Sequence, residues 1–284
     1  MAMQNQLSNQ SKKATFSSFM TSPMVVNKVN SMVGGKDGQR FITAIISAVS
    51  NNAALQECES NSILSAAMLG ESLKLSPSPQ LGQYYMVPFN NKGGKVAQFQ
   101  LGYKGYVQLA IRSGKYKKLN VLAIKEGELI RYDPLNEEIE VKLIDDELLR
   151  EQSNTIGYYA MFEYLDGFRK TMYWSKEKME AHALKYSKGY QAKKGYTFWE
   201  KDFDGMAYKT MLRQLISKWG SMSIEFQTAF EKDMGSIKED GSVDYVDTNA
   251  SVFDTSNVVA DVKETPTTQE VITKTDVVED DPMA

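Results

Sequence analysis

The segment from Leu73 to Lys118 constrains the fold more than any other part of the chain. It contains Ser76–Pro79, where two prolines end any preceding helix, because proline has no backbone N–H and restricts the residue before it. Two runs with strand character, Gln83–Phe89 and Lys95–Gln100, then flank the glycine-containing turn Asn90–Gly94. The segment therefore predicts a hairpin of two antiparallel strands.

A helix predicted over Leu101–Arg112 follows this hairpin and ends at Gly114, which suits a left-handed C-terminal cap. Cations and aromatic rings alternate along the helix and its exit. Because cations bind phosphates and rings stack on bases, the pattern is typical of a protein that holds a nucleic-acid strand without reading its sequence. The residues are Lys104, Arg112, Lys115, Lys117 and Lys118, with Tyr103, Tyr106 and Tyr116 among them.

The whole pattern predicts an α+β fold, in which an antiparallel sheet of consecutive hairpins carries packed helices and follows N-terminal helices in residues 21–72. Asp166-Gly167 is the strongest hairpin signal in the chain. Ser175 caps a helix that runs to about Ser187, and a last helix covers Asp202–Trp219. The other predicted strands are Leu119–Lys125, Glu128–Tyr132, Glu137–Leu143, Thr155–Tyr164 and Phe168–Trp174.

Charge is divided unevenly along the chain, although the net charge is only −3. Residues 236–284 hold three lysines against twelve carboxylates, a net −9, which leaves 30 cations against 24 carboxylates, or +6, in residues 1–235. Apolar density falls beyond Gly235, so a disordered acidic tail is predicted over 236–284, with a flexible N-terminus over 1–20. A basic body suits a polyanion binder, and the acidic tail either competes with DNA for the cationic surface, docks a partner, or only keeps the chain soluble.

The last helix carries Lys209 and Arg213 four residues apart, so that they project side by side from one face. Cations one turn apart match successive phosphates of a strand lying across the helix, and an ordinary solvated face is the alternative. Another face is expected to be buried and holds Leu212, Leu215, Ile216 and Trp219.

The loop at 187–198 also mixes cations with rings. Such loops often grip nucleic acid; the alternatives are a plain surface loop and, for Trp199, a place in the core. The residues concerned are Lys188, Lys193, Lys194, Tyr190, Tyr196 and Phe198, with Trp199 directly after them.

Several other classes of protein are disfavoured. With Cys58 as the only cysteine and His182 as the only histidine, the chain has neither a disulfide framework nor a Cys/His zinc site. The motif G-x-x-x-x-G-K-[ST] does not occur, which argues against an NTP-driven motor. Asp145–Glu147, or Asp202 with Asp204, could hold Mg²⁺, but carboxylates at helix N-termini are the preferred interpretation.

No catalytic residue and no metal ligand is therefore predicted, and the chain is not expected to be an enzyme. The longest apolar runs fall far short of the ~20 residues that span a bilayer, and the N-terminus has no apolar run typical of a signal peptide. We therefore expect a cytoplasmic protein that makes no membrane contact.

Four segments together resemble the RecT family of phage single-strand annealing recombinases. The resemblance covers about residues 20–235 and implies a β-β-β-α core. It implies ATP-independent annealing of complementary single-stranded DNA in phage homologous recombination, by a homo-oligomeric ring or helical filament. It further implies a bacterial host cytoplasm, a phage exonuclease and host single-strand-binding protein as partners, and an annealed duplex as intermediate. The segments are LKLSPSPQLGQYYMVPF (73–89), LGYKGYVQLAIRSGKYKK (101–118), MYWSKEKMEAH (172–182) and FWEKDFDGMAYKTMLRQLISKWG (198–220).

The resemblance places family cations at Lys104, Arg112, Lys209 and Arg213, and family aromatic residues at Tyr103 and Trp199. The chain departs from some relatives at Gln214 and Ser217, where they carry a cation, and Lys218 is the candidate substitute. No cofactor is expected, neither ATP nor a metal, although Mg²⁺ is expected to modulate binding. The predicted DNA-binding set is Tyr103, Lys104, Arg112, Lys115, Lys117, Lys118, Lys193, Lys194, Phe198, Trp199, Lys209 and Arg213.

Annealing is the leading hypothesis, and a passive single-stranded DNA-binding protein, which protects strands without promoting pairing, is the main alternative. A Mg²⁺-dependent nuclease and a scaffold without DNA affinity are the others. Replacing Lys209 and Arg213 with alanine is expected to weaken DNA binding and its salt dependence. Deleting 236–284 is expected to raise DNA affinity if the tail competes for the cationic surface.

Overall fold

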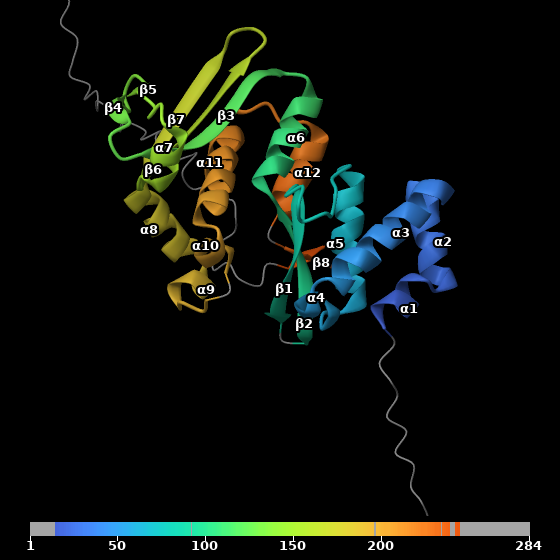
Figure 1. Ribbon diagram of the computed structural model, residues 1–284. Coiled ribbons are helices and arrows are strands. Elements are labelled where there is room, and N and C mark those ends of the chain that lie inside the picture. Colours follow the sequence, from blue (N-terminus) through green and yellow to red (C-terminus); the bar gives the residue numbers. More distant parts are fainter. Residues whose placement is uncertain (1–14, 92, 196, 234, 239–241, 245–284) are drawn as a thin grey trace, which may run out of the picture. The chain divides into compact units, whose positions relative to one another are not determined.

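The computed structural model describes residues 15–91, 93–195, 197–233, 235–238 and 242–244, which form a mixed fold of helices and antiparallel strands (Figure 1). The predicted α+β class is confirmed. The described helices are α1 (Phe16–Met20), α2 (Pro23–Val33), α3 (Gly35–Ser50), α4 (Ala53–Gln56), α5 (Ser60–Ser72), α6 (Tyr103–Ser113), α7 (Glu147–Gln152), α8 (Lys176–Tyr186), α9 (Lys188–Gln191), α10 (Phe198–Lys201), α11 (Phe203–Trp219) and α12 (Ile224–Lys232). The described strands are β1 (Tyr84–Asn91), β2 (Gly94–Leu101), β3 (Tyr116–Lys125), β4 (Leu129–Asp133), β5 (Glu138–Val141), β6 (Thr155–Tyr164), β7 (Arg169–Ser175), β8 (Ser236–Ile237) and β9 (Val243–Asp244).

The helices α1 to α5 precede the first strand, as the apolar spacing of this region predicts. On α3, Phe41, Ile45 and Val49 are buried in a hydrophobic cluster that includes residues of α5, β1, β2 and α6. Met20 of α1 has no exposed surface and belongs to the same cluster. The flexible N-terminus predicted over 1–20 is therefore too long, and its first 14 residues lie outside the described part of the chain.

The predicted hairpin and the helix after it are confirmed. Strands β1 and β2 pair antiparallel, with Tyr84 opposite Leu101. A Cβ atom on Gly102 would lie 2.1 Å from the backbone oxygen of Gly82, so only glycine lets α6 begin this close to the chain before β1. Gly114 follows α6 in the left-handed conformation, with φ of 67°. These glycines position both ends of α6.

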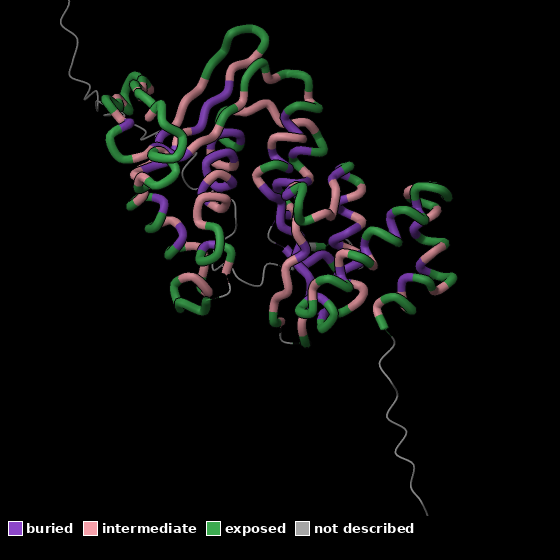
Figure 2. Tube along the Cα trace, viewed as in Figure 1, coloured by how far each residue is buried: buried purple, intermediate pink, exposed green. Residues whose placement is uncertain are grey.

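A second sheet has the strand order β3-β6-β7. Strand β3 pairs with β6, rather than with the next strand in the chain, while β4 and β5 pair only with each other among the described strands. Helices α8 and α11 cover one face of the sheet and enclose a second hydrophobic cluster that includes Tyr158, Phe162 and Met211. These buried parts of β6 and α11 are purple in Figure 2.

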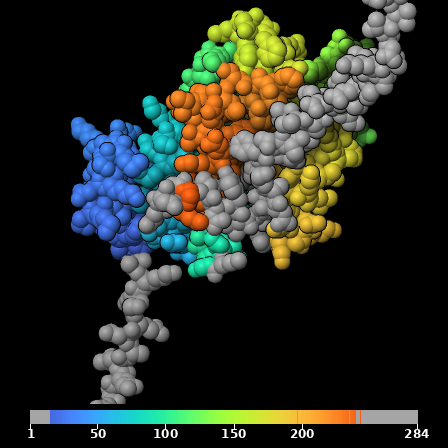
Figure 3. Space-filling model, turned by 180° about the vertical axis from the view of Figure 1, so that it is seen from behind, coloured from blue at the N-terminus to red at the C-terminus, as the bar shows by residue number. Residues whose placement is uncertain are grey.

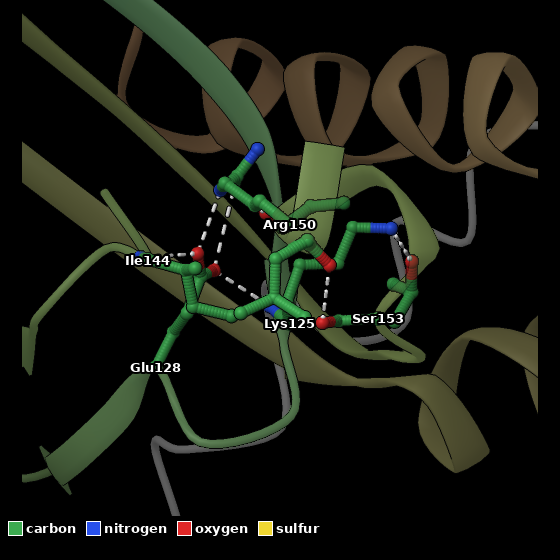
Figure 4. Close-up of polar contacts among 8 residues, drawn as sticks. Lys125, Glu128, Ile144, Arg150 and Ser153 are labelled. Carbon is green, nitrogen blue, oxygen red and sulfur yellow. Dashed lines mark hydrogen bonds and ion pairs between the residues drawn. The ribbon is translucent and has the colours of Figure 1, made fainter. Parts of the chain in front are cut away.

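Glu128 anchors the segment that contains β4, β5 and α7 to the end of β3 (Figure 4). Its carboxylate is fully buried, accepts hydrogen bonds from the backbone N–H groups of Lys125 at 2.7 Å and Ile144 at 3.1 Å, and pairs with Arg150 Nε at 2.6 Å. Arg150 also donates to the carbonyl oxygen of Ala123 at 2.8 Å. Burial alone would raise the pKa of Glu128, but Arg150 and the two N–H donors hold that pKa below its ordinary value.

The fold continues past the boundary predicted at residue 235. Ser236 and Ile237 are buried, and Phe99 donates its backbone N–H to the carbonyl oxygen of Gly235 at 3.0 Å. The boundary predicted for the acidic tail, at residue 236, is therefore too early. The residues of the predicted tail from 245 onward lie outside the described part of the chain. Among the described helices, none is long and apolar enough to cross a membrane.

Candidate nucleic-acid interface

The predicted cations Lys104, Arg112, Lys115, Lys117 and Lys118 are all exposed and lie on α6, on its exit and on β3. We call these five residues the α6–β3 face. Lys117 and Lys118 share one carboxylate, that of Glu163 on β6, at 2.6 and 3.4 Å. Within the described part of the chain, no carboxylate forms an ion pair with Lys104, Arg112 or Lys115. The face therefore carries an excess of positive charge.

Two of these cations are held in place by distant parts of the chain. The guanidinium of Arg112 donates to the carbonyl oxygen of Leu73 at 2.5 Å, at the end of α5. The ammonium of Lys115 donates to the Ser221 hydroxyl at 2.6 Å, between α11 and α12. Figure 3 shows the molecule from behind, where the end of the β6–β7 hairpin lies beside α11 and α12. Neutral partners fix these side chains without cancelling their charge.

The rings of this region are less accessible than the sequence predicts. Tyr106 has no exposed surface and packs against Phe226 and Phe230 of α12, because it lies on the core side of α6. Tyr116 is half-buried, and its ring lies edge to face with that of Tyr164, with 5.0 Å between the ring centres. Tyr103, also half-buried, contacts Tyr208 of α11 edge to face at 5.7 Å. Only the partly exposed surface of Tyr103 and Tyr116 remains for a ligand.

The loop after α8 contains two short helices, α9 and α10. Of its predicted DNA-binding residues, three are exposed and one is buried. Lys193 and Lys194 are exposed, and the ring of Phe198 is 36% exposed and lies 5.4 Å from the ring of Tyr85 on β1. Trp199 is only 6% exposed and packs in the second hydrophobic cluster, so the alternative of a core residue is confirmed and its placement at an interface is wrong. Tyr85, the second of two adjacent tyrosines in the sequence, is not among the predicted residues but contacts the predicted Phe198.

Lys209 and Arg213 do not lie on the surface. The Lys209 side chain is 6% exposed and that of Arg213 is 12% exposed, and both pair with the fully buried carboxylate of Asp233, at 3.0 and 2.7 Å. Asp233 also accepts the backbone N–H of Leu101 at 2.8 Å and the Tyr106 hydroxyl at 3.3 Å. The expectation that these cations project toward phosphates is therefore wrong for this conformation, because Asp233 draws both of them inward.

The end of α11 requires a related correction. Leu212, Leu215 and Ile216 are buried as predicted, but Trp219 is 50% exposed. Trp219 is the last residue of α11, and the ammonium of Lys170 lies over the Trp219 ring, 3.8 Å from the ring centre. The side chain therefore lies at the edge of the sheet rather than in the core.

The carboxylates considered for Mg²⁺ have structural partners. Asp146 and Asp202 cap α7 and α11 by accepting the backbone N–H groups of Leu149 and Gly205, and Asp204 accepts the Tyr158 hydroxyl at 2.6 Å. A cleft of about 510 Å³ beside Asp202 and Asp204 is also lined by two lysines, Lys176 and Lys201. In the described ranges, no group of three or more acidic, cysteine or histidine residues is arranged to hold a metal ion.

An α+β scaffold with exposed cations beside partly exposed rings is typical of proteins that bind a flexible polyanion. A sequence model of the RecT family matches residues 39–245 of this chain. The chain is 40% identical over 266 residues to the uncharacterised protein YqaK of Bacillus subtilis (strain 168), covering 92% of this chain and 86% of that protein. It is 30% identical over 227 residues to the protein RecT of Escherichia coli (strain K12), covering 77% and 80% of the two chains.

The chain therefore belongs to the RecT family. At the level of the family, this membership supports single-strand annealing in DNA recombination, with single-stranded DNA as a partner and with self-association.

Proposed function

We propose that this protein binds single-stranded DNA on the α6–β3 face and anneals complementary strands without ATP. The observation that carries the proposal is that Lys104, Arg112 and Lys115, along α6 and its exit, are exposed and form no ion pair with a described carboxylate. Backbone phosphates supply the countercharge, and few base-edge contacts are needed because base pairing reads the sequence.

The energetics of annealing need no fuel. Two strands repel each other through their phosphates, and a cationic face that neutralises one backbone lowers that repulsion. Correct pairing then releases roughly 1.4 kcal/mol per base-pair step from stacking. The proposed role is therefore to align strands and not to make or break a covalent bond, so the protein is not an enzyme in the covalent sense and needs no metal cofactor.

The further partners follow from the family and the charge pattern. We propose that copies of the chain assemble into a ring or helical filament, which brings many α6–β3 faces into one line. The annealed duplex intermediate, a phage exonuclease and host single-strand-binding protein are the proposed partners, in the cytoplasm of a bacterial host.

A matched pair of variants tests the proposal. In the Lys104→Gln, Lys115→Gln variant, the slope of log K against log salt for a labelled single strand should fall by about 1.4, since each lost phosphate contact removes about 0.7. A control variant carries Lys28→Gln and Lys142→Gln. Both lysines are exposed and neither belongs to the α6–β3 face, so this variant should leave the slope unchanged. Equal slopes in both variants would remove the α6–β3 face from the binding site. Tight binding that slows pairing would instead indicate a passive single-stranded DNA-binding protein.

A further inference from the structure

A second group of cations and rings lies on β7, on α8 and at the end of α11. We call it the α8 strip and define it as Lys170, Trp174, Lys178, His182, Lys185 and Trp219. None of these residues belongs to the α6–β3 face. Trp219 is half exposed, Lys178 and Lys185 are exposed, and Trp174 and His182 are partly exposed.

Cations and rings alternate along the strip at contact distance. The ammonium of Lys178 lies 4.5 Å from the ring centre of Trp174, whose ring lies 5.5 Å from that of His182. The ammonium of Lys185 lies 5.0 Å from the ring centre of Tyr186. The ring centres of Tyr186 and His182 are 4.6 Å apart. Trp174, Lys178 and His182 are spaced four residues apart, which places them along one line at the start of α8 and on its successive turns.

The strip holds more positive than negative charge. In the described part of the chain, Lys170 forms an ion pair with Glu137 at 2.8 Å, whereas Lys178, Lys185 and the nearby Lys218 form none.

The two carboxylates of α8, Glu177 and Glu180, form no ion pair with Lys170, Lys178 or Lys185 in the described part of the chain. Burial, followed by the positive charge of Lys218, lowers the pKa of Lys178 below its ordinary value, as expected where two cations lie near each other.

The strip faces away from part of the α6–β3 face. Across the sheet, Lys118 of β3 is aligned with Glu163 of β6 and Arg169 of β7. The next row consists of Leu119 of β3, Phe162 of β6 and Lys170 of β7. Because successive side chains of a strand point to opposite faces, Lys118 and Lys170 lie on opposite faces of the sheet. A strand that lies along the α8 strip therefore does not touch Lys118 at the same point.

We propose that the α8 strip is a second binding site for single-stranded nucleic acid, which holds the incoming complementary strand while the α6–β3 face holds the first. The proposal rests on the proposed function, because annealing requires two strands to be held at once. The lysines bind phosphates, and the exposed faces of Trp219 and Trp174 stack on bases in a manner that tolerates any sequence.

The test compares two triple variants of the full-length protein with equal changes of charge. The strip variant carries Lys170→Gln, Lys178→Gln and Lys185→Gln, which are the three lysines of the strip, and the control carries Lys28→Gln, Lys36→Gln and Lys142→Gln at exposed positions. Each is loaded with a labelled oligonucleotide, and a complementary strand containing 5-iododeoxyuridine is added. Binding of the first strand, the rate of pairing by fluorescence transfer, and photocrosslinks of the second strand to the Trp174 and Trp219 peptides are measured.

The strip variant should bind the first strand within about twofold of the control, yet pair strands about tenfold more slowly and lose the crosslinks, because three phosphate contacts are missing. Equal pairing rates for the two triple variants would overturn the proposal. So would a parallel loss of first-strand affinity, since the strip would then belong to the first site. If the wild-type protein does not accelerate pairing, the proposed annealing function is wrong. In that case the crosslinks to Trp174 and Trp219 still test whether the strip binds nucleic acid, and their absence would overturn it.

Discussion

The single histidine of the chain provides a sharp test of how the α8 strip is built. His182 is partly buried between the rings of Trp174 and Tyr186. Burial, followed by the positive charges of Lys185 and Arg213, lowers its pKa from 6.5 to about 4. The folded protein therefore keeps this imidazole neutral at a pH where the unfolded chain protonates it.

The consequence for stability has a definite sign. Between pH 6.5 and pH 4 the unfolded state binds more protons at His182 than the folded state, so stability falls as the pH is lowered through this window. For these two pKa values, moving from pH 7 to pH 5 should lower the free energy of unfolding by roughly 2 kcal/mol. Stability from this group is complete above the unfolded value of 6.5.

The measurement is urea unfolding followed by far-ultraviolet circular dichroism at pH 7 and pH 5. The His182→Gln variant has no imidazole, so it should lose less stability than the wild type over the same interval by roughly 2 kcal/mol, whatever its stability at pH 7. Equal losses in the two proteins, within about 0.5 kcal/mol, would refute the partial burial of His182 between the rings of Trp174 and Tyr186.

Three further changes test the buried contacts. Asp233→Asn should lower the free energy of unfolding, measured in urea, by about 3 kcal/mol, because two buried cations lose their carboxylate. Adding Lys209→Met should recover part of this loss, since one of those cations is then gone. Losses that simply add would contradict the pairing of Lys209 with Asp233. Glu128→Gln should cost about 2 kcal/mol and speed hydrogen exchange within residues 129–152 beyond that of the exposed control Glu126→Gln, whereas uniform exchange would contradict its anchoring role. Gly102→Ala should destabilise by about 2 kcal/mol in the same unfolding assay, since the new Cβ would lie 2.1 Å from a backbone oxygen, and an unchanged midpoint would contradict that close approach.

Local signals in the sequence were sufficient for most of the secondary structure. Asp166-Gly167 predicted the β6–β7 hairpin, Ser175 caps α8 by accepting the Lys178 N–H, and Gly114 ends α6. Each of these depends on residues within a few positions of one another, so no knowledge of the tertiary fold was needed.

The errors came from contacts between residues far apart in the chain. Helical spacing correctly placed Lys209 and Arg213 close together, but their partner Asp233 lies 24 and 20 residues further on, beyond any local pattern. Similarly, β3 pairs with β6 across the β4–β5–α7 segment, whose anchor joins Glu128 to Arg150, 22 residues away. The exposure of the α6–β3 cations could be predicted locally, whereas the partners that fix Arg112 and Lys115, at Leu73 and Ser221, are distant in the sequence and could not.

The central claim is tested most directly by pairing two complementary labelled oligonucleotides with the wild-type protein, in the presence of a metal chelator and without any nucleotide. Fluorescence transfer should then rise faster than in the spontaneous reaction, and the product should remain bound to the protein. Pairing at or below the spontaneous rate, with the single strands tightly bound, would contradict annealing and indicate a protein that only protects single strands.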